Sequence, residues 1–182
     1  MNMNTKDSEE NRLIQHPSLW EGLGRLSDDR PIQHPSLGEG LGRPYGLIDL
    51  PKIVDPRGNL TVAEQLKNVP FDIARVYWTY DVPSGERRGG HAHRTCEEIV
   101  IAVSGSFDVT VDDGRGGKEV FHLNHPYQGL YIGTGVWRTL EDFSSGAVCL
   151  VLASELFDED EYIYDYEEFL EAHPSPPKGR DV

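Results

Sequence analysis

The chain has 182 residues, enough for one barrel-sized domain with its own hydrophobic core. It carries 31 acidic residues against 17 Lys and Arg, which gives a formal net charge of −14. Because such a surface repels DNA and RNA, we expect no nucleic-acid partner. We also expect no membrane partner, since no stretch approaches the ~18 apolar residues that a membrane span needs.

The N-terminal part of the chain contains a duplication. Residues 14–25, IQHPSLWEGLGR, recur at 32–43 with a single difference. Two copies are too few for a stacked repeat architecture, and residues 1–44 show no sustained period of 2 or 3.6. We therefore expect 1–44 to be a flexible, disordered extension, and the role of its duplication stays open.

The chain contains two cysteines, Cys96 and Cys149. Residues 1–10 are polar and do not resemble an export signal. We therefore expect a cytoplasmic protein whose cysteines are buried, reduced thiols.

From residue 45 the pattern changes to short apolar runs separated by turn residues every eight to twelve positions. This spacing is typical of an all-β sandwich or barrel, and closure into a barrel or jelly roll would protect the strand edges. We expect one domain over 45–174 and a short tail over 175–182. The candidate strands are 46–50, 58–64, 73–80, 96–104, 106–111, 118–123, 129–132, 137–140 and 147–153.

The last segment of the domain has a different pattern. Over 158–172, five apolar and aromatic residues recur with helical spacing, and we expect a short C-terminal helix. Its apolar face is expected to pack on the barrel or on a second subunit. These residues are Tyr162, Ile163, Tyr166, Phe169 and Leu170.

The most informative motif begins at Gly85. With His91, His93, Glu98 and Gly105 it fits the spacing G-x5-H-x-H-x4-E-x6-G of the first cupin motif. In a strand, His91 and His93 point to the same face, where two imidazoles can bind a metal or transfer protons near pH 7. Gly89 and Gly90, just before them, allow the backbone to bend.

The second cupin motif argues against a metal. Metal-binding cupins take a fourth ligand from a His in this motif, but Arg138 occupies that position, following Trp137. Arginine is a permanent cation that cannot ligate a metal and would repel a divalent ion. We therefore expect no metal and no other cofactor.

Two histidines without a metal suit enolisation beside a ketone. One group removes the proton alpha to the carbonyl and another returns a proton elsewhere, each typically contributing ~10²–10⁴-fold. Arginines near such a site can bind phosphate through their planar fork of donors. The candidates are Arg57, Arg75 and Arg88, although Arg75 is equally well explained as a surface charge.

From about residue 47 to 170 the chain resembles the sugar 3,4-ketoisomerases that act on dTDP-4-keto-6-deoxyglucose, the FdtA- and WxcM-like cupins. The resemblance combines several segments and is more specific than the cupin motif alone. These segments are 55–60, 70–77, 88–93, 129–133 with 136–137, 142–145, and 151–154 with the acidic run 158–163.

The resemblance implies a metal-free, cupin-type jelly roll that works as a homodimer, often with an N-terminal strand exchanged between subunits. It implies an isomerase that serves the synthesis of deoxyamino sugars for surface polysaccharides. His91 and His93 match the catalytic pair of this family. The residues that match substrate-binding positions, with Arg138 added for stabilisation of an enediolate oxygen, are Arg57, Arg88, Tyr131 and Arg138.

The expected reaction moves the keto group of dTDP-4-keto-6-deoxyglucose from C4 to C3 through an enediol. We expect His93 to remove the C3 proton and His91 to relay a proton, although the residues alone do not separate the two roles. Whether the nucleotide is dTDP or UDP, and the C4 configuration of the product, stay open.

Three alternatives remain. A nucleotide-sugar 3,5-epimerase would abstract a proton beside the same ketone and leave the ketone at C4. A metal-dependent cupin such as a dioxygenase is opposed by Arg138. A non-catalytic sugar-binding cupin would bind the nucleotide sugar unchanged.

Overall fold

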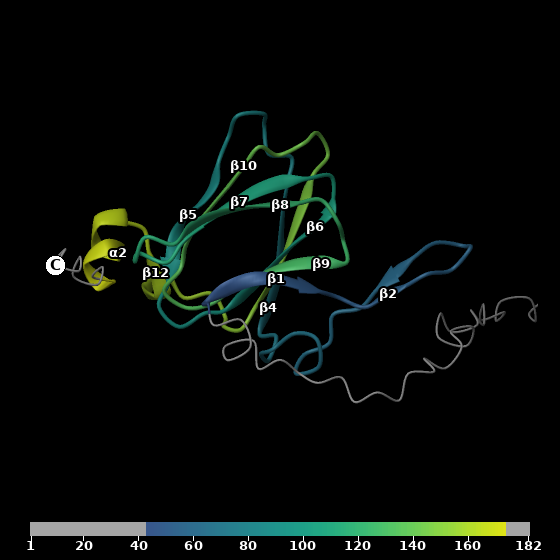
Figure 1. Ribbon diagram of the computed structural model, residues 1–182, viewed down its shortest axis with the longest axis horizontal. Coiled ribbons are helices and arrows are strands. Elements are labelled where there is room, and N and C mark those ends of the chain that lie inside the picture. The colour runs from purple at the N-terminus through teal and green to yellow at the C-terminus, as the bar shows by residue number, and fades with distance from the viewer. Residues whose placement is uncertain (1–42, 174–182) are drawn as a thin grey trace, which may run out of the picture. The chain divides into compact units, whose positions relative to one another are not determined.

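The computed structural model describes residues 43–173. The duplication, apart from its last residue, and the tail over 175–182 therefore lie outside the described residues. The described part consists mainly of two five-stranded antiparallel sheets that face each other (Figure 1). The expected all-β, cupin-type jelly roll with a short C-terminal helix is confirmed.

The strands of each sheet are not consecutive in sequence. In spatial order, the first sheet contains β1 (Tyr45–Asp49), β9 (Gln128–Ile132), β6 (Glu98–Ser104), β11 (Val148–Ala153) and β4 (Arg75–Tyr80). The second sheet contains β12 (Tyr162–Ile163), β5 (Arg88–His93), β10 (Trp137–Glu141), β7 (Phe107–Asp112) and β8 (Lys118–Leu123). Strands that follow one another in the sequence mostly lie in opposite sheets, as in a jelly roll.

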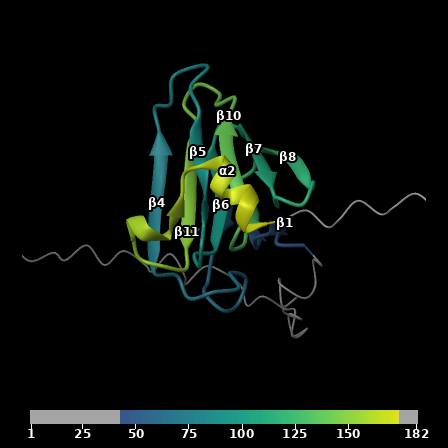
Figure 2. The same cartoon turned by 90° about the vertical axis from the view of Figure 1, so that its left-hand side faces the viewer.

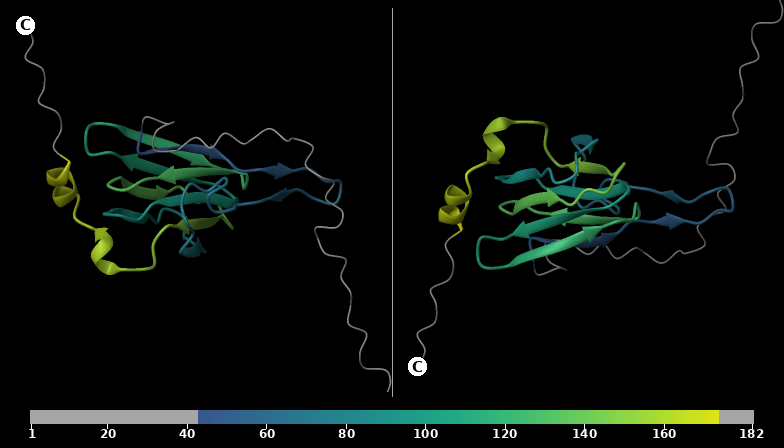
Figure 3. Two further views of the ribbon diagram at one scale, coloured as in Figure 1. Left: turned by 90° about the horizontal axis from the view of Figure 1, so that it is seen from below. Right: turned by 90° about the horizontal axis from the view of Figure 1, so that it is seen from above.

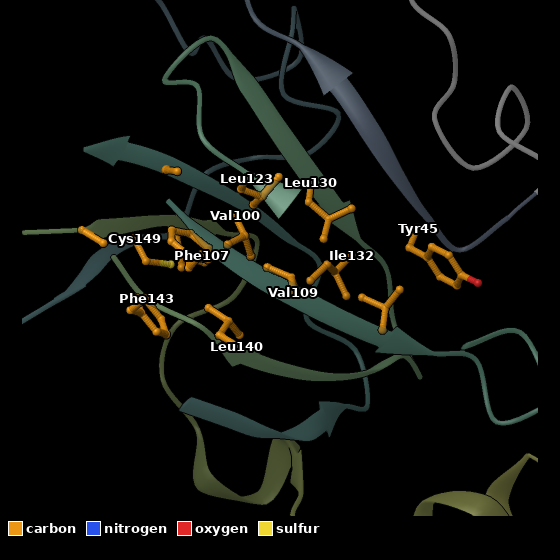
Figure 4. Packing of buried hydrophobic residues seen from close by; sticks show 14 of the residues in the cluster. Tyr45, Val100, Phe107, Val109, Leu123, Leu130, Ile132, Leu140, Phe143 and Cys149 are labelled. Carbon is orange, nitrogen blue, oxygen red and sulfur yellow. The ribbon is translucent and has the colours of Figure 1, made fainter. Parts of the chain in front are cut away.

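The main hydrophobic core lies between the two sheets (Figure 4). Alternation along β7 places Phe107, Val109 and Val111 inside, where each is fully buried, as their spacing predicts. From the opposite sheet, Leu130 and Ile132 on β9 complete this core. The next strand, β8, pairs with β7 as an antiparallel hairpin.

A second apolar cluster covers the outer face of the first sheet. Ile99 and Ile101 of β6 point out of the barrel and pack under Val69 and Phe71, which lie in the segment between β3 and β4. This packing fixes the course of the chain before β4. The outer face of β4 itself remains exposed.

The prediction for 58–64 was largely wrong. Only β3 (Leu60–Thr61) is a strand there, and it pairs with β2 (Lys52–Ile53) in a small hairpin. The two strands are joined by a turn in which the Asp55 carbonyl accepts from the N–H of Gly58 at 2.9 Å. This hairpin projects from the barrel at the end opposite to helix α2 (Figures 1 and 3).

The C-terminal segment is only partly helical. Residues Glu159–Glu161 form a 3-10 turn, and β12 (Tyr162–Ile163) pairs with β5. Helix α2 (Tyr166–Ala172) begins after Asp165, whose carboxylate accepts from two backbone N–H groups of the first turn. The helical prediction failed for Tyr162 and Ile163 because their backbone is hydrogen-bonded to the sheet.

The apolar face of α2 packs on the barrel, which is one of the two expected alternatives. Phe169 is fully buried against Ala92 of β5 and Ile163 of β12, with Trp137 of β10 beside it. Figure 1 shows α2 next to β12 at one end of the barrel, and Figure 2 views the barrel from that end. Within residues 43–173, no helix has both the length and the apolar character needed to cross a membrane.

Candidate active site

The two histidines of the motif lie on β5, a strand that the segmentation into apolar runs did not predict. The pairing of β5 with β10 shifts register, because Arg138 is opposite His91 while Thr139 is opposite Gly89. Gly90 is therefore an extra residue, a β-bulge. Gly89 and Gly90 have φ values of +76° and +74°, conformations that glycine adopts without strain.

This bulge requires glycine at position 89. A Cβ at Gly89 would lie 2.8 Å from the carbonyl oxygen of Arg138. The bulge bends β5 just before the histidines and directs both imidazoles into the barrel. The ring centroids of His91 and His93 are 5.0 Å apart in an edge-to-face arrangement.

A cavity of about 370 Å³ opens beside these histidines. It contains both charged and apolar groups, as sites for small polar ligands usually do. Its lining residues come from β4, β5, β6, β10, β11 and the segment before α2: Arg75, Tyr77, Thr79, Arg88, Gly89, His91, Glu98, Val100, Arg138, Leu140, Cys149, Val151, Phe157 and Tyr162.

His91 and His93 occupy different positions relative to this cavity. His91 is half-buried and lines the cavity. His93 is fully buried and does not belong to the lining. A substrate in the cavity would therefore meet His91 first, with His93 behind it.

Glu98 connects the charged groups of the site. Its carboxylate accepts from Arg138 Nη2 at 2.5 Å and from the Tyr77 hydroxyl at 2.7 Å. One carboxylate oxygen also lies 3.4 Å from Nε2 of His93. Burial acts to raise the pKa of Glu98, but Arg138, His93 and the Tyr77 hydrogen bond together hold it below the usual range.

Both imidazoles are held in the neutral form at pH 7. Burial, the charge of Arg138 and the neighbouring His93 lower the pKa of His91 to about 3. Burial also lowers the pKa of His93, although Glu98 opposes this shift. Nε2 of His91 and both ring nitrogens of His93 have no hydrogen-bond partner among the described residues. Neutral imidazoles with free nitrogens can accept and deliver protons.

The cavity is also lined by two arginines that form no ion pair within residues 43–173. Arg88 begins β5 and is exposed at the cavity wall. The Arg75 guanidinium lies over the rings of Tyr77 and Phe157, 5.1 and 5.7 Å from their centroids. Its Nη2 donates to the Tyr162 hydroxyl at 3.4 Å. Arg75 lines the cavity, which favours a role in the site over the alternative interpretation as a surface charge.

The structure does not bring Arg57 and Tyr131 into this cavity. Arg57 lies in the β2–β3 turn, with a side chain that is 77% exposed and paired with Asp55 at 2.8 Å. This pairing lowers the pKa of Asp55 to about 2. Tyr131 belongs to the cluster on the outer face of the first sheet, where burial raises its pKa to about 12.

Arg138 is not an unpaired cation beside the cavity, because its guanidinium forms an ion pair with Glu98. The pair is nearly inaccessible to water. His93, Cys96 and Glu98 place ligand atoms within 4.8 Å of one another, but the Arg138 guanidinium already neutralises Glu98. This donor set therefore fits a cupin metal site poorly.

Three aromatic lining residues were not predicted as site residues from the sequence: Tyr77, Phe157 and Tyr162. The alternation of β4 contained a signal for Tyr77, since Arg75, Tyr77 and Thr79 share one face. No comparable signal marked Phe157 or Tyr162. Their position depends on how the C-terminal segment folds back over β5.

The chain matches known proteins along this whole domain. The family model described as FdtA: WxcM-like, C-terminal, matches residues 43–174. A TDP-4-oxo-6-deoxy-alpha-D-glucose-3,4-oxoisomerase of Aneurinibacillus thermoaerophilus is 44% identical over 123 residues, which are 68% of this chain and 88% of the relative.

Solved structures agree with this match. A 3,4-ketoisomerase from Helicobacter canadensis is 42% identical with a TM-score of 0.68, covering 70% of this chain and 96% of its own. A variant of the 3,4-ketoisomerase QdtA from Thermoanaerobacterium thermosaccharolyticum, in complex with TDP-4-keto-6-deoxyglucose, is 37% identical with a TM-score of 0.69, covering 71% and 93%. The sugar epimerase NovW from Streptomyces spheroides, at 21% identity and a TM-score of 0.57, covering 65% and 67%, shares the fold. The chain belongs to the FdtA family of WxcM-like proteins, and it is an isomerase of the 3,4-ketoisomerase type.

Proposed function

We propose that this enzyme moves the keto group of dTDP-4-keto-6-deoxyglucose from C4 to C3. The observation that carries the proposal is a pair of neutral imidazoles with unpartnered nitrogens at a cavity that also presents arginines. The relative in Aneurinibacillus acts on the TDP-linked 4-oxo sugar, and QdtA binds TDP-4-keto-6-deoxyglucose. The product would serve deoxyamino-sugar synthesis for surface polysaccharides.

In the proposed reaction, a base removes the C3 proton and O4 takes up a proton, which gives an enediol. A proton then adds to C4 while the O3 hydroxyl loses its proton, which leaves the ketone at C3. The sequence favoured His93 as the base, but the cavity favours the reverse assignment. His91 lines the cavity and is the group we expect to exchange protons with the sugar, while His93, whose ring centroid lies 5.0 Å from that of His91, would assist from behind it.

Arg138 remains a candidate for stabilising the enediolate oxygen. It lines the cavity, and its Nε has no hydrogen-bond partner in the described residues. Since Glu98 neutralises part of its charge at 2.5 Å, we expect a positioned donor rather than a full compensating charge. Full kcat in an Arg138→Ala variant would remove this role.

Arg88 and Arg75 are the proposed contacts for the diphosphate of the substrate. Both line the cavity, and the guanidinium fork suits phosphate oxygens. Tyr131 is omitted from the proposed substrate contacts, since its ring lies on the far face of β9.

We propose that the enzyme works as a homodimer. On β4, which is the edge strand of the first sheet, Val76, Trp78 and Tyr80 are about half exposed on the outer face. An apolar edge strand of this kind is a favourable place for a second chain to dock.

Two buried cysteines that are free thiols fit our expectation of a reducing cytoplasm.

A dimer would also give Arg57 a role. The β2–β3 hairpin carries Arg57 away from its own barrel (Figure 1), so we propose that it reaches the diphosphate in the cavity of a second copy. Homodimers of the Arg57→Ala variant and of the His91→Asn variant should each have little or no activity. Co-expressed with different affinity tags, the mixed dimer should regain about half of the native activity, because one of its sites is complete. No recovery would show that Arg57 does not act across the dimer.

The test of the function is proton NMR of dTDP-4-keto-6-deoxyglucose incubated with the enzyme in D₂O. A 3-keto product with deuterium at C4 is expected, and its C4 coupling constants would give the configuration. Exchange at C3 and C5 with the ketone still at C4 would identify a 3,5-epimerase instead. An unchanged substrate that still binds would identify a sugar-binding protein, and the UDP-linked sugar would then be compared.

A further inference from the structure

Tyr162 lies against both histidines of the site. Its ring centroid is 4.9 Å from that of His91 and 4.4 Å from that of His93. Its contact with His93 is edge-to-face, a favourable geometry for aromatic rings. Tyr162 is therefore one wall of the cavity and packs against both imidazoles.

This packing matters because hydrogen bonds orient the imidazoles only in part. In most active sites a carboxylate or carbonyl fixes the ring of a catalytic histidine through one nitrogen. Here both nitrogens of His93 and Nε2 of His91 lack hydrogen-bond partners within residues 43–173, and Glu98 approaches His93 only to 3.4 Å. A backbone hydrogen bond at Gly89 holds His91 in part, and ring packing supplies the rest of the orientation.

The hydroxyl of Tyr162 faces a second group of the cavity. It accepts from Nη2 of Arg75 at 3.4 Å, and this contact raises the pKa of Arg75 although burial opposes it. The guanidinium otherwise lies among the rings of Tyr77 and Phe157. One side chain thus connects the proton-transfer groups with a cation at the cavity wall.

The backbone holds Tyr162 in this position. Tyr162 pairs with His93 in the β12–β5 ladder, so the ring and one imidazole move together. The preceding residue, Glu161, accepts from the N–H of Thr95 at 2.8 Å and also from its hydroxyl. The N–H of Arg94 donates to the Glu161 carbonyl at 2.9 Å. The segment around Tyr162 is therefore tied to the turn that follows the histidines.

We propose that Tyr162 is a positioning residue, whose ring sets the orientation of His91 and His93 and whose hydroxyl holds Arg75 toward an anionic group of the substrate. The inference rests on the proposed function for its kinetic consequences only. It makes separate predictions for the ring and for the hydroxyl.

Two substitutions separate these contributions. Tyr162→Phe keeps the ring, so kcat should stay within about threefold while KM rises, because Arg75 loses its acceptor. Tyr162→Leu removes the ring, and kcat should fall by roughly 10–100-fold, since small misplacements of reacting groups have effects of this size. Tyr166→Phe is the matched control for loss of a hydroxyl: its bond to Asp112, 2.6 Å long, lies on the outer face of the second sheet, and neither constant should change.

A measurement without substrate separates this proposal from the proposed function. Imidazole resonances followed by ¹H–¹⁵N NMR over a pH titration should show the pKa of both histidines higher in Tyr162→Leu than in the native protein, because water reaches the rings. Tyr162→Phe should leave the titration unchanged. An inactive native enzyme would refute the function without touching this readout.

Three results would overturn the inference. In the first, Tyr162→Leu has native kcat and native imidazole titration. In the second, Tyr162→Phe loses as much kcat as Tyr162→Leu, which would make the hydroxyl a participant in the chemistry. The third applies if Tyr162→Leu does not fold. The double variant Thr95→Ala with Glu161→Gln is then used to loosen the segment around Tyr162, and a native imidazole titration in this variant would overturn the inference.

Discussion

Two regions of the barrel interior differ in what they bury. Around Phe107, Val109 and Ile132 the core is entirely apolar, and alternation along each strand fills it. Around Glu98 and Arg138 the same barrel buries an ion pair with a neutral histidine beside it. The first region stabilises the fold without burying any charge. The second buries charges, so the loss of one partner of the ion pair would strongly destabilise the fold.

This difference separates effects on stability from effects on activity. Substitutions in the apolar region should change the free energy of unfolding and leave turnover intact. Substitutions in the charged region should change turnover, and some of them should change both quantities.

The largest effect is expected at His91. His91→Asn keeps a polar side chain of smaller size but removes the base, so kcat should fall by ~10²–10⁴-fold. Substrate should still bind, since Arg75 and Arg88 are unchanged. Single-turnover NMR and a binding titration measure the two quantities. Near-native kcat in both His91→Asn and His93→Asn would contradict the proton-transfer scheme.

The next effect concerns the buried ion pair. Arg138→Met leaves Glu98 buried without its partner at 2.5 Å, so the free energy of unfolding should fall by about 3–5 kcal/mol. The double variant Arg138→Met with Glu98→Gln removes both charges and should regain part of this loss. Urea unfolding measures both variants. Equal stability of the single and double variants would mean that Glu98 does not depend on Arg138.

The pH dependence of stability tests the neutral imidazoles. Histidine in the unfolded chain has a pKa near 6.5, whereas in the fold that of His91 is lowered to about 3 and that of His93 is also lowered. Below pH ~6.5 the unfolded state therefore binds protons that the folded state does not. The free energy of unfolding should fall steadily as the pH is lowered from 7.5 to 5.

A substitution at His91 tests the origin of this pH dependence. His91→Asn should flatten the slope of stability against pH, because it removes one of the two buried imidazoles whose pKa is lowered. Since the imidazoles stay neutral, kcat/KM should also hold its value well below pH 6. A fall of kcat/KM as the pH is lowered through 6.5 would contradict the lowered pKa values.

The sequence predicted the parts of the molecule that depend on local periodicity. Alternation located β7 and β8, and the motif spacing located His91 and His93 on one face. The positive φ values that the paired glycines of β5 adopt agree with the expected bend. These features depend on a few neighbouring residues, so the sequence is enough to find them.

The parts that were missed depend on long-range packing. A two-residue strand such as β12 has no period of its own, and the spacing of Tyr162 and Ile163 imitates a helix face. Only their pairing with β5, about 70 positions earlier in the chain, determines their structure. The position of Arg57 outside its own cavity likewise depends on where a whole hairpin points. Motif spacing contains no such information.

The smallest effect tests the apolar region by itself. Ile132→Val removes one methyl group from a fully buried side chain in the core between the sheets. It should lower the free energy of unfolding by about 0.5–1.5 kcal/mol through lost burial and a small void. Because Ile132 does not line the cavity, kcat and KM should stay native. A changed kcat at unchanged stability would mean that packing on β9 reaches the imidazoles, and the two regions of the barrel would then be mechanically coupled rather than independent.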